Sequence, residues 1–131
     1  MNKGQIDLLE NLSIGVDIEE VERFRKLDIT NNKSFFKKIY TPKEIKHCLK
    51  RSDPSFCLAV RFAGKEAIMK ALSQFSVKAS PREIEILNDK KGAPSVKISS
   101  VKTKNIKVII SLSHTKRNAI AFALGVKTKN G

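Results

Sequence analysis

The stretch that most constrains the fold is Ser55–Phe75, whose side chains are apolar on almost every side of a helix. A helix that is apolar all round is normally buried inside a domain. The same stretch nevertheless carries one carboxylate, Glu66, and three cations: Arg61, Lys65 and Lys70. Because burying charge without a partner costs free energy, charge that persists in such a helix is usually paired or bound to a metal.

A second carboxylate, Asp17, is flanked by apolar residues in Leu12–Ile18. This segment alternates like a strand, with Gly15 and Asp17 on one face and three apolar side chains on the other: Ile14, Val16 and Ile18. Two carboxylates held against basic side chains suit the binding of a hard cation together with a phosphate group. Asp17 and Glu66 are therefore candidate ligands of such a cation.

Charge is the second global constraint. The chain has 131 residues and a formal net charge of +13, and no Asp or Glu occurs after Asp89. Such a protein attracts polyanions, so its partner is a nucleic acid, an acidic protein or a multiply phosphorylated small molecule, unless the lysines only aid solubility. With 40% hydrophobic residues and no apolar run long enough to cross a bilayer, the composition is that of one globular domain.

The cysteines and the N-terminus bear on location and on metals. Cys48 and Cys57 are not in a CxxC arrangement, and Met1–Asn11 does not read as a secretory signal. We therefore expect two reduced thiols in a cytoplasmic protein. The only histidines are His47 and His114, and their spacing from the cysteines argues against a zinc site.

The rest of the chain mixes short helices with hairpins. Acidic residues after Ile18 suit the first turn of a helix, and Thr41–Glu44 is typical of a helix start with a capping box. Strands are predicted for four further segments: Glu83–Leu87, Val96–Ile98, Ile106–His114 and Ala119–Val126. These patterns predict an α+β domain in which a long buried central helix packs on antiparallel strands.

Three segments resemble one known family. They are Ile14–Arg23 (IGVDIEEVER), Arg61–Leu72 (RFAGKEAIMKAL) and Ser111–Thr115 (SLSHT), and their order and separations are similar to those of holo-acyl-carrier-protein synthases, the small single-domain 4′-phosphopantetheinyl transferases. The resemblance covers about Ser13 to Val126. It implies a single domain over 1–131, with an N-terminal extension at 1–11, a transferase core at 12–126 and a frayed tail at 127–131.

The resemblance implies a reaction and a metal site. Members of this family move the 4′-phosphopantetheine arm of coenzyme A onto a serine of an apo acyl carrier protein, release adenosine 3′,5′-bisphosphate and need Mg²⁺. By this likeness Asp17 and Glu66 hold the metal, and together with Lys70 they are the catalytic residues. Lys65 and Lys70 are expected to contact the nucleotide phosphates, which suits a reaction that depends on positioning and charge neutralisation.

The resemblance also assigns the nucleotide end of the site. Five residues are expected to contact coenzyme A there: Gly92, Pro94, Ser113, His114 and Thr115. This chain departs from the family at two places. The family often has G-K-P where this chain has Gly92-Ala93-Pro94, so a lysine contact is absent, and the usually glycine-rich segment after the central helix is Leu72-Ser73-Gln74-Phe75.

The expected macromolecular partner is an acidic acyl carrier protein. Arg23, Arg25 and Lys26 should lie exposed on the first helix and form its docking face, where opposite charges speed encounter. Family members are generally homotrimers in which two subunits share each coenzyme A site. The resemblance thus implies a trimeric cytoplasmic enzyme of fatty acid biosynthesis that binds neither a membrane nor a specific nucleic acid.

The candidate residues also have structural explanations. Asp17 could cap the helix that follows it, and Glu66 could pair with Lys70 four residues on. In that case the other two cations of the helix would extend their charged ends to solvent. A histidine at a strand end, such as His114, is more often structural than catalytic.

Two other functions explain part of the pattern. A basic nucleic-acid-binding module without catalysis explains the charge but not Asp17 and Glu66, and its binding would fall steeply with salt. A catalytically weak coenzyme A-binding protein would fit the departures at Gly92–Pro94 and Leu72–Phe75.

Overall fold

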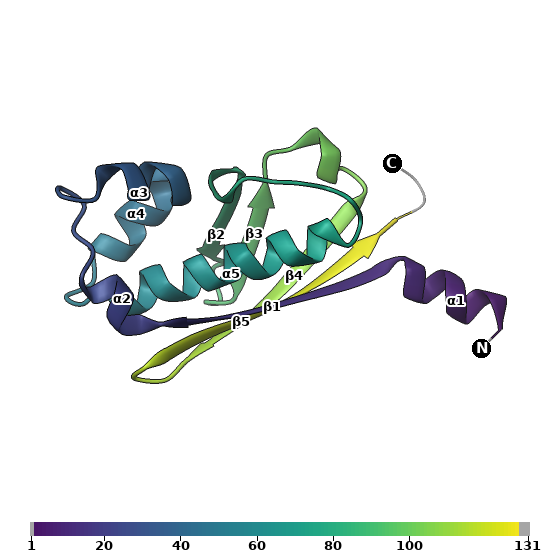
Figure 1. The fold of residues 1–131 in the computed structure, drawn as a ribbon, viewed down its shortest axis with the longest axis horizontal. Coiled ribbons are helices and arrows are strands. Elements are labelled where there is room, and N and C mark those ends of the chain that lie inside the picture. The colour runs from purple at the N-terminus through teal and green to yellow at the C-terminus, as the bar shows by residue number, and fades with distance from the viewer. Residues whose placement is uncertain (1, 129–131) are drawn as a thin grey trace.

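One long helix, α5 (Ser55–Ser73), lies across a three-stranded antiparallel sheet (Figure 1). The sheet has the strand order β1-β5-β4, with these bounds: β1 Leu12–Glu20, β5 Asn118–Lys127 and β4 Ile106–His114. This computed structural model describes residues 2–128, so the predicted frayed tail lies mostly outside the described residues. The predicted α+β fold with a long central helix on antiparallel strands is confirmed.

The remaining elements surround α5 (Figure 1). Three short helices gather at its N-terminal end: α2 (Val21–Arg25), α3 (Lys33–Ile39) and α4 (Pro42–Leu49). Two strands form a separate antiparallel hairpin: β2 (Ile84–Asn88) and β3 (Pro94–Ile98). Helix α1 (Lys3–Glu10) projects from the opposite end of the sheet. Within residues 2–128, no helix is both long and apolar enough to cross a membrane.

Most predicted elements have nearly the predicted bounds. β4 matches its prediction, β5 is one residue longer at each end, β2 is shifted by one residue, and β3 begins two residues earlier than expected. The capping box of α4 is confirmed: Thr41 Oγ1 accepts from the Glu44 N–H at 3.3 Å, and Glu44 Oε1 accepts from the Thr41 N–H at 2.9 Å. Helices α1 and α3 were not predicted.

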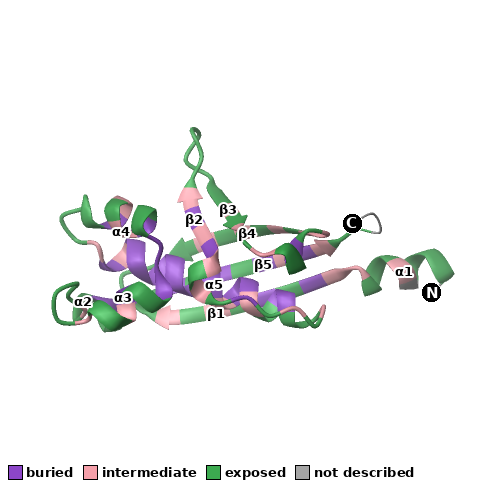
Figure 2. Ribbon diagram, turned by 90° about the horizontal axis from the view of Figure 1, so that it is seen from above, coloured by how far each residue is buried: buried purple, intermediate pink, exposed green. Residues whose placement is uncertain are grey.

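The alternation predicted for β1 is confirmed, and the buried face is the one that carries the small residues. Ile14, Val16 and Ile18 are 55%, 52% and 62% exposed, whereas Gly15 is buried against α5. The burial classes accordingly alternate along β1 (Figure 2). The strand β5 continues this pattern, since its inward residues are small and fully buried: Ala119, Ala121 and Ala123. The inner face of the sheet is therefore nearly flat.

This flatness lets α5 approach the backbone of β1. A Cβ atom placed on Gly15 would lie 1.9 Å from the carbonyl oxygen of Ala67 and 3.0 Å from the amide nitrogen of Ala71. The helix contributes alanines at the same contact, and Ala63, Ala67 and Ala71 are all fully buried. Only glycine fits this position of the strand.

The larger side chains pack at the two ends of α5. At its N-terminal half, an aromatic cluster joins α2 and α3 to the helix, and the Tyr40 hydroxyl donates to the Leu58 carbonyl at 2.8 Å. At its C-terminal half, Ile68 and Leu72 pack with Ile84 and Ile86 of β2. The central part of α5 is left to the alanine contacts and to the polar groups described below.

The contact between Gly15 and α5 yields a stability prediction. We expect Gly15→Ala to lower the free energy of unfolding by about 3 kcal/mol or more, because the new methyl group overlaps backbone that cannot move aside. Urea unfolding followed by circular dichroism measures this change. Gly4→Ala is the matched control, since its Cβ would meet only Asn2 Oδ1 at 3.5 Å. Equal unfolding midpoints for the two variants would contradict the close approach.

Candidate active site

Asp17 and Lys70 meet where β1 passes under α5. The Asp17 side chain is only 13% exposed, and its Oδ1 lies 3.4 Å from the Lys70 Nζ. The same ammonium donates to the Val16 carbonyl at 2.9 Å. Lys70 therefore extends to β1. The sequence leaves open an ion pair between Lys70 and Glu66, and in the structure Lys70 pairs with Asp17 instead.

The second oxygen of Asp17 is available for a ligand. Asp17 Oδ2 is buried and has no hydrogen-bond partner among the described residues. Asp17 does not cap α2 either, because the N-cap of that helix is Glu20, which makes no side-chain capping bond. A buried carboxylate oxygen without a donor is costly, so a bound cation would improve this position.

A third carboxylate adds to the negative charge. Glu19 lies two residues along β1 from Asp17, on the same inner face, and its Oε1 pairs with the Arg23 Nη1 at 3.0 Å. Burial, and then the neighbouring Asp17 carboxylate, raise the pKa of Glu19 to about 7. A carboxylate whose charge is disfavoured by burial and by a neighbouring carboxylate forms the kind of environment that a cation relieves.

The position of Glu66 follows from hydrogen bonds that repeat along α5. Lys70 bonds to Val16 of β1, and Gln74 bonds to Ile14, accepting from its N–H at 3.1 Å and donating to its carbonyl at 2.8 Å. Four residues of helix and two of strand both advance about 6 Å, so the helix side chains step along the strand in register. One further step of this register would set Glu66 level with Ile18, the residue after Asp17, and Glu66 is half-buried.

Gln74 also explains one departure from the family pattern. Its amide covers both backbone groups of Ile14 on β1, which is an edge strand in the order β1-β5-β4. Exposed edge groups invite pairing with other chains. The segment Leu72–Phe75 thus ties the helix end to the strand, a role that the sequence pattern did not reveal.

Lys65 has a different environment from the one expected. Its side chain is 1% exposed, and its Nζ forms an ion pair with Glu44 Oε1 at 2.7 Å. The same ammonium donates to the carbonyls of Pro81 (2.9 Å) and Ile84. All three donors are used inside the protein, so we leave Lys65 out of the proposed phosphate-binding residues. Arg61, four residues earlier, is likewise buried and donates from Nε to the Ile86 carbonyl at 3.0 Å.

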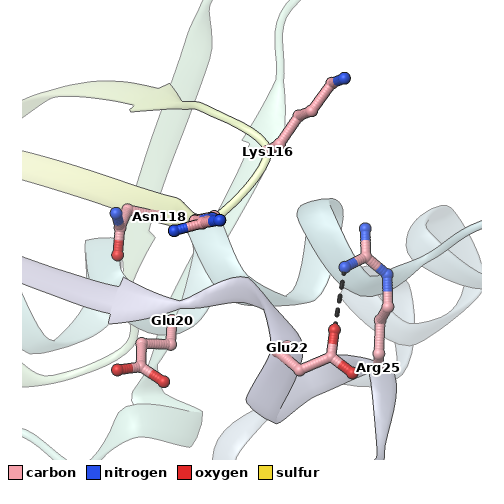
Figure 3. Close-up of a pocket in the computed structure, with 6 residues that line it drawn as sticks. Glu20, Glu22, Arg25, Lys116 and Asn118 are labelled. Atoms are coloured by element: carbon pink, nitrogen blue, oxygen red, sulfur yellow. Dashed lines mark hydrogen bonds and ion pairs between the residues drawn. The ribbon is translucent and has the colours of Figure 1, made fainter.

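The three docking candidates lie on the surface of α2 and just after it. Arg23, Arg25 and Lys26 are exposed as predicted, but both arginines have acidic neighbours, and Arg25 Nη1 pairs with Glu22 at 3.1 Å. A cleft of about 500 Å³ adjoins this helix (Figure 3) and is lined by residues from the end of β1, from α2, from the β4–β5 turn and from the start of β5: Glu20, Glu22, Arg25, Lys116, Arg117 and Asn118. The surface is therefore of mixed charge.

Some of the predicted nucleotide contacts share a second cleft. Gly92, Pro94 and His114 line a space of about 640 Å³ together with two arginines, Arg51 and Arg61. The His114 ring packs on Phe56, with centroids 4.8 Å apart. Ser113 and Thr115 do not line this cleft, because Ser113 points to the outer face of β4 and the Thr115 hydroxyl accepts from the turn at Asn118.

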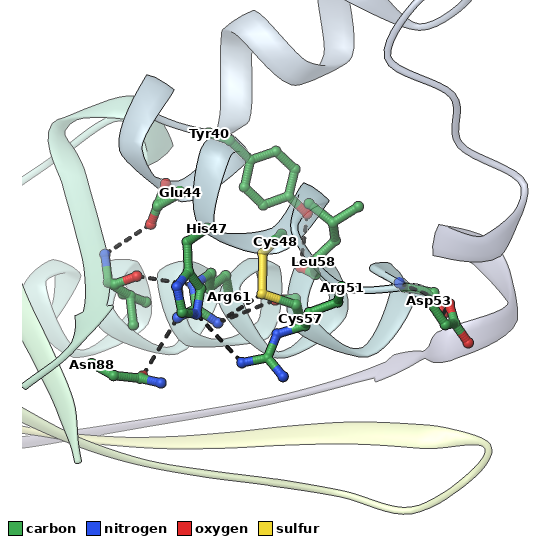
Figure 4. The surroundings of a disulfide bond; sticks show 12 residues. Tyr40, Glu44, His47, Cys48, Arg51, Asp53, Cys57, Leu58, Arg61 and Asn88 are labelled. Carbon is green, nitrogen blue, oxygen red and sulfur yellow. Dashed lines mark hydrogen bonds between the residues drawn. A yellow bond between two sulfur atoms is a disulfide. The ribbon is translucent and has the colours of Figure 1, made fainter. Parts of the chain in front are cut away.

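The expectation of two reduced thiols is wrong in this structure. Cys48 of α4 and Cys57 of α5 form a disulfide, with Cα atoms 5.4 Å apart (Figure 4). Cys57 also lines the second cleft, and its Sγ lies 3.3 Å from the Arg61 Nη1. The two cysteines are nine residues apart in sequence, and only the turn between the helices brings them together. The argument from free thiols to a cytoplasmic location is thereby removed.

The disulfide yields a redox prediction. We expect a reductant to lower the free energy of unfolding by about 2–3 kcal/mol, the chain-entropy value for so short a closed loop. Guanidinium unfolding with and without a phosphine reductant measures it. In the double variant Cys48→Ala/Cys57→Ala the reductant should change nothing. Two thiols that react with a thiol reagent in the denatured, unreduced protein would contradict the disulfide.

The buried pair of Lys65 and Glu44 yields a second prediction. We expect Lys65→Met to cost about 3–5 kcal/mol of unfolding free energy, because Glu44 is left buried without its counterion. Lys70→Met is the matched control, and its half-exposed ion pair should contribute about 1 kcal/mol or less. Chemical denaturation compares them. A loss for Lys65→Met no larger than for Lys70→Met would show that the buried pair is not structural.

Comparison with known proteins supplies the family. A family model described as the 4′-phosphopantetheinyl transferase superfamily matches residues 13–123. A holo-[acyl-carrier-protein] synthase of Chlorobaculum parvum is 42% identical over 114 residues, which cover 86% of this chain and 97% of that protein. One of Protochlamydia amoebophila is 42% identical over 117 residues, which cover 86% of this chain and 96% of that protein.

Solved structures agree with the sequence comparisons. An ACPS–CoA complex of Chronobacterium ammoniagenes has a TM-score of 0.76 and 25% identity, covering 90% of this chain and 98% of its own. A holo-[acyl-carrier-protein] synthase of Helicobacter pylori in complex with coenzyme A has a TM-score of 0.71 and 32% identity, covering 88% and 99%. This chain belongs to the holo-[acyl-carrier-protein] synthases of the 4′-phosphopantetheinyl transferase superfamily.

Proposed function

We propose that this protein transfers the 4′-phosphopantetheine moiety of coenzyme A to a serine of an apo acyl carrier protein, with Mg²⁺, and releases adenosine 3′,5′-bisphosphate. The observation that carries the proposal is the Asp17 carboxylate: its Oδ2 is buried without a hydrogen-bond partner within residues 2–128, and its Oδ1 lies 3.4 Å from the Lys70 ammonium. A carboxylate oxygen and a cation side by side can receive a metal and a phosphate together. The relatives' names and their complexes with coenzyme A support the same reaction.

Asp17 and Glu66 are the residues that would hold the metal. Among residues 2–128, no group of three or more His, Cys, Asp or Glu side chains is arranged as a metal site. Mg²⁺ does not require one, because it commonly takes one or two carboxylates and completes its shell with water and substrate phosphate. When bound, it would neutralise charge that develops on the pyrophosphate of coenzyme A.

Lys70 is the residue we assign to the phosphates. Its ammonium is half-exposed and lies within 3.4 Å of the Asp17 carboxylate, so it can approach a phosphate bound there. In the cleft near the β2–β3 turn, Arg51 and His114 supply further groups for an anionic nucleotide, and Gly92 lets the turn backbone come close with a φ of 88°. These groups position the substrate, which is the main requirement of phosphoryl transfer.

The carrier protein would dock on the exposed basic side chains of α2. Arg23 and Arg25 already pair with Glu19 and Glu22, so an acidic partner has to compete with internal carboxylates. Such exposed pairs are weak, and an acidic helix with several carboxylates can replace them. Opposite charges would then orient the serine toward Asp17.

We propose further that the chain forms a homotrimer with active sites at the subunit interfaces. Six large apolar side chains on the outer face of the sheet are 43–62% exposed: Ile14, Val16, Ile18, Ile109, Ile120 and Phe122. We call this set the outer apolar face. Monomeric proteins rarely expose so continuous an apolar surface. Other copies of the chain would cover it, and the two clefts described above would then be completed from a neighbouring subunit.

Intact-mass measurement of an apo acyl carrier protein tests the reaction. We expect a phosphopantetheine-sized gain with coenzyme A and Mg²⁺ that EDTA prevents. Asp17→Asn and Glu66→Gln should lower the rate by about a thousandfold or more, because several kcal/mol of charge stabilisation are lost. Asp28→Asn, an exposed carboxylate in the loop after α2, is the matched control and should keep full activity.

Three other results would change the assignment. Full activity of Asp17→Asn would remove the metal role from this residue. Coenzyme A binding without any mass gain would favour a binding protein over an enzyme. Neither transfer nor coenzyme A binding, together with DNA binding that falls steeply with salt, would favour the basic nucleic-acid-binding module.

A further inference from the structure

Helix α1 is built from residues that precede the family match. The match begins at residue 13, whereas α1 spans Lys3–Glu10. The helix starts with a full capping box: Asn2 Oδ1 accepts from the Gln5 N–H at 2.9 Å, and Gln5 Oε1 accepts from the Asn2 N–H at 2.9 Å. It extends beyond the end of the sheet, away from α2, α3 and α4 (Figures 1 and 2).

A single residue, Asn11, joins α1 to the sheet. Its N–H donates to the Leu8 carbonyl at 3.1 Å, and its side-chain amide donates to the Asp7 carbonyl at 2.8 Å. Its own carbonyl accepts from the Lys127 N–H of β5 at 2.9 Å, so the strand ladder continues up to the helix. With bonds on both sides of Asn11, α1 has a fixed direction relative to β1 and no flexible linker.

Two apolar side chains near the C-terminal end of this helix are exposed. Leu8 and Leu9 are 60% and 54% exposed. An isolated helix of this length is marginal in water even with good caps, and most helical stability in proteins comes from packing of an apolar face. Two leucines on a short, capped, projecting helix therefore indicate a surface that is buried in an assembly.

We propose that α1 packs on a second copy of this chain and strengthens the oligomer. The inference rests on the proposed function, since it extends the trimer interface assigned there. The observation that selects a second copy is continuity: α1 is joined through Asn11 to β1, on which Ile14 is the first residue of the outer apolar face and is 55% exposed. A surface that covers this face also reaches the helix that continues from it.

Charge complementarity supports the same partner. In a chain with a net charge of +13, α1 carries two carboxylates, Asp7 and Glu10, against one lysine. The exposed Lys107 of β4 lies at the same end of the sheet, because Lys107 and Leu12 both pair with Val126. A second copy thus presents a lysine close to the exposed apolar side chain of Ile109. This combination is complementary to α1, where exposed leucines lie close to carboxylates in the sequence.

Sedimentation velocity over a dilution series tests the proposal. We expect the double variant Leu8→Asp/Leu9→Asp to raise the dissociation constant of the oligomer by about tenfold or more, since buried apolar anchors dominate interfaces. Leu8→Ala/Leu9→Ala retains helix propensity and should give a smaller rise. Leu49→Asp, a 43% exposed leucine in α4 at the other end of the molecule, is the control and should change nothing.

The outcomes separate this proposal from the proposed reaction. An unchanged dissociation constant in the double variant overturns the role of α1 and leaves transfer activity untouched. A wild-type chain that stays monomeric at every concentration overturns both the role of α1 and the trimer. If the proposal holds, activity of the double variant returns when its concentration is raised, whereas Asp17→Asn stays inactive at any concentration. Failure of transfer in the wild type does not affect the sedimentation result.

Discussion

The close approach of α5 to β1 is the constraint on which the other features depend. Gly15 allows the helix backbone to touch the strand, where an added Cβ would lie 1.9 Å from the Ala67 carbonyl oxygen. At that separation, side chains four residues apart on the helix reach backbone groups two residues apart on the strand. Lys70 and Gln74 do so on β1, and Arg61 and Lys65 do so on β2. The polar residues of an apolar helix thus act as cross-links to two sheets.

The same constraint determines which face of the sheet is left bare. Because the face of the sheet that packs against α5 must be flat, the inner positions of β1 and β5 hold glycine, alanine and the acidic residues of the site. The large apolar residues are thereby placed outside. A strand normally buries its larger apolar face, and in the proposed trimer other copies of the chain would cover it. The close packing at Gly15 therefore accounts both for the candidate site beneath α5 and for the exposed outer apolar face.

Sequence patterns predicted the elements well where one local signal decides them. The β4 bounds, the Thr41–Glu44 capping box and the pairing of Lys65 with a carboxylate follow from alternation, capping chemistry and the cost of burying ions. The specific partners did not follow. Glu44 was predicted only as a cap residue, yet its two oxygens also bind Lys65 and the Ile86 N–H. The disulfide and the burial of Lys65 depend on how α4 and β2 pack against α5, and spacing along the chain carries no information about that.

Two lysine–carboxylate pairs on α5 show why one is structural and the other suits catalysis. Lys65 and Glu44 are 1% and 0% exposed, and further hydrogen bonds hold both groups. Removing either partner would therefore leave the other charge buried without a counterion. Lys70 is 55% exposed, and its contact with Asp17 is long at 3.4 Å. A pair of that kind contributes about 0–1 kcal/mol. In the proposed reaction, a metal ion would therefore displace Lys70 from Asp17 at little cost, and the ammonium would remain near the carboxylate to contact the substrate phosphate.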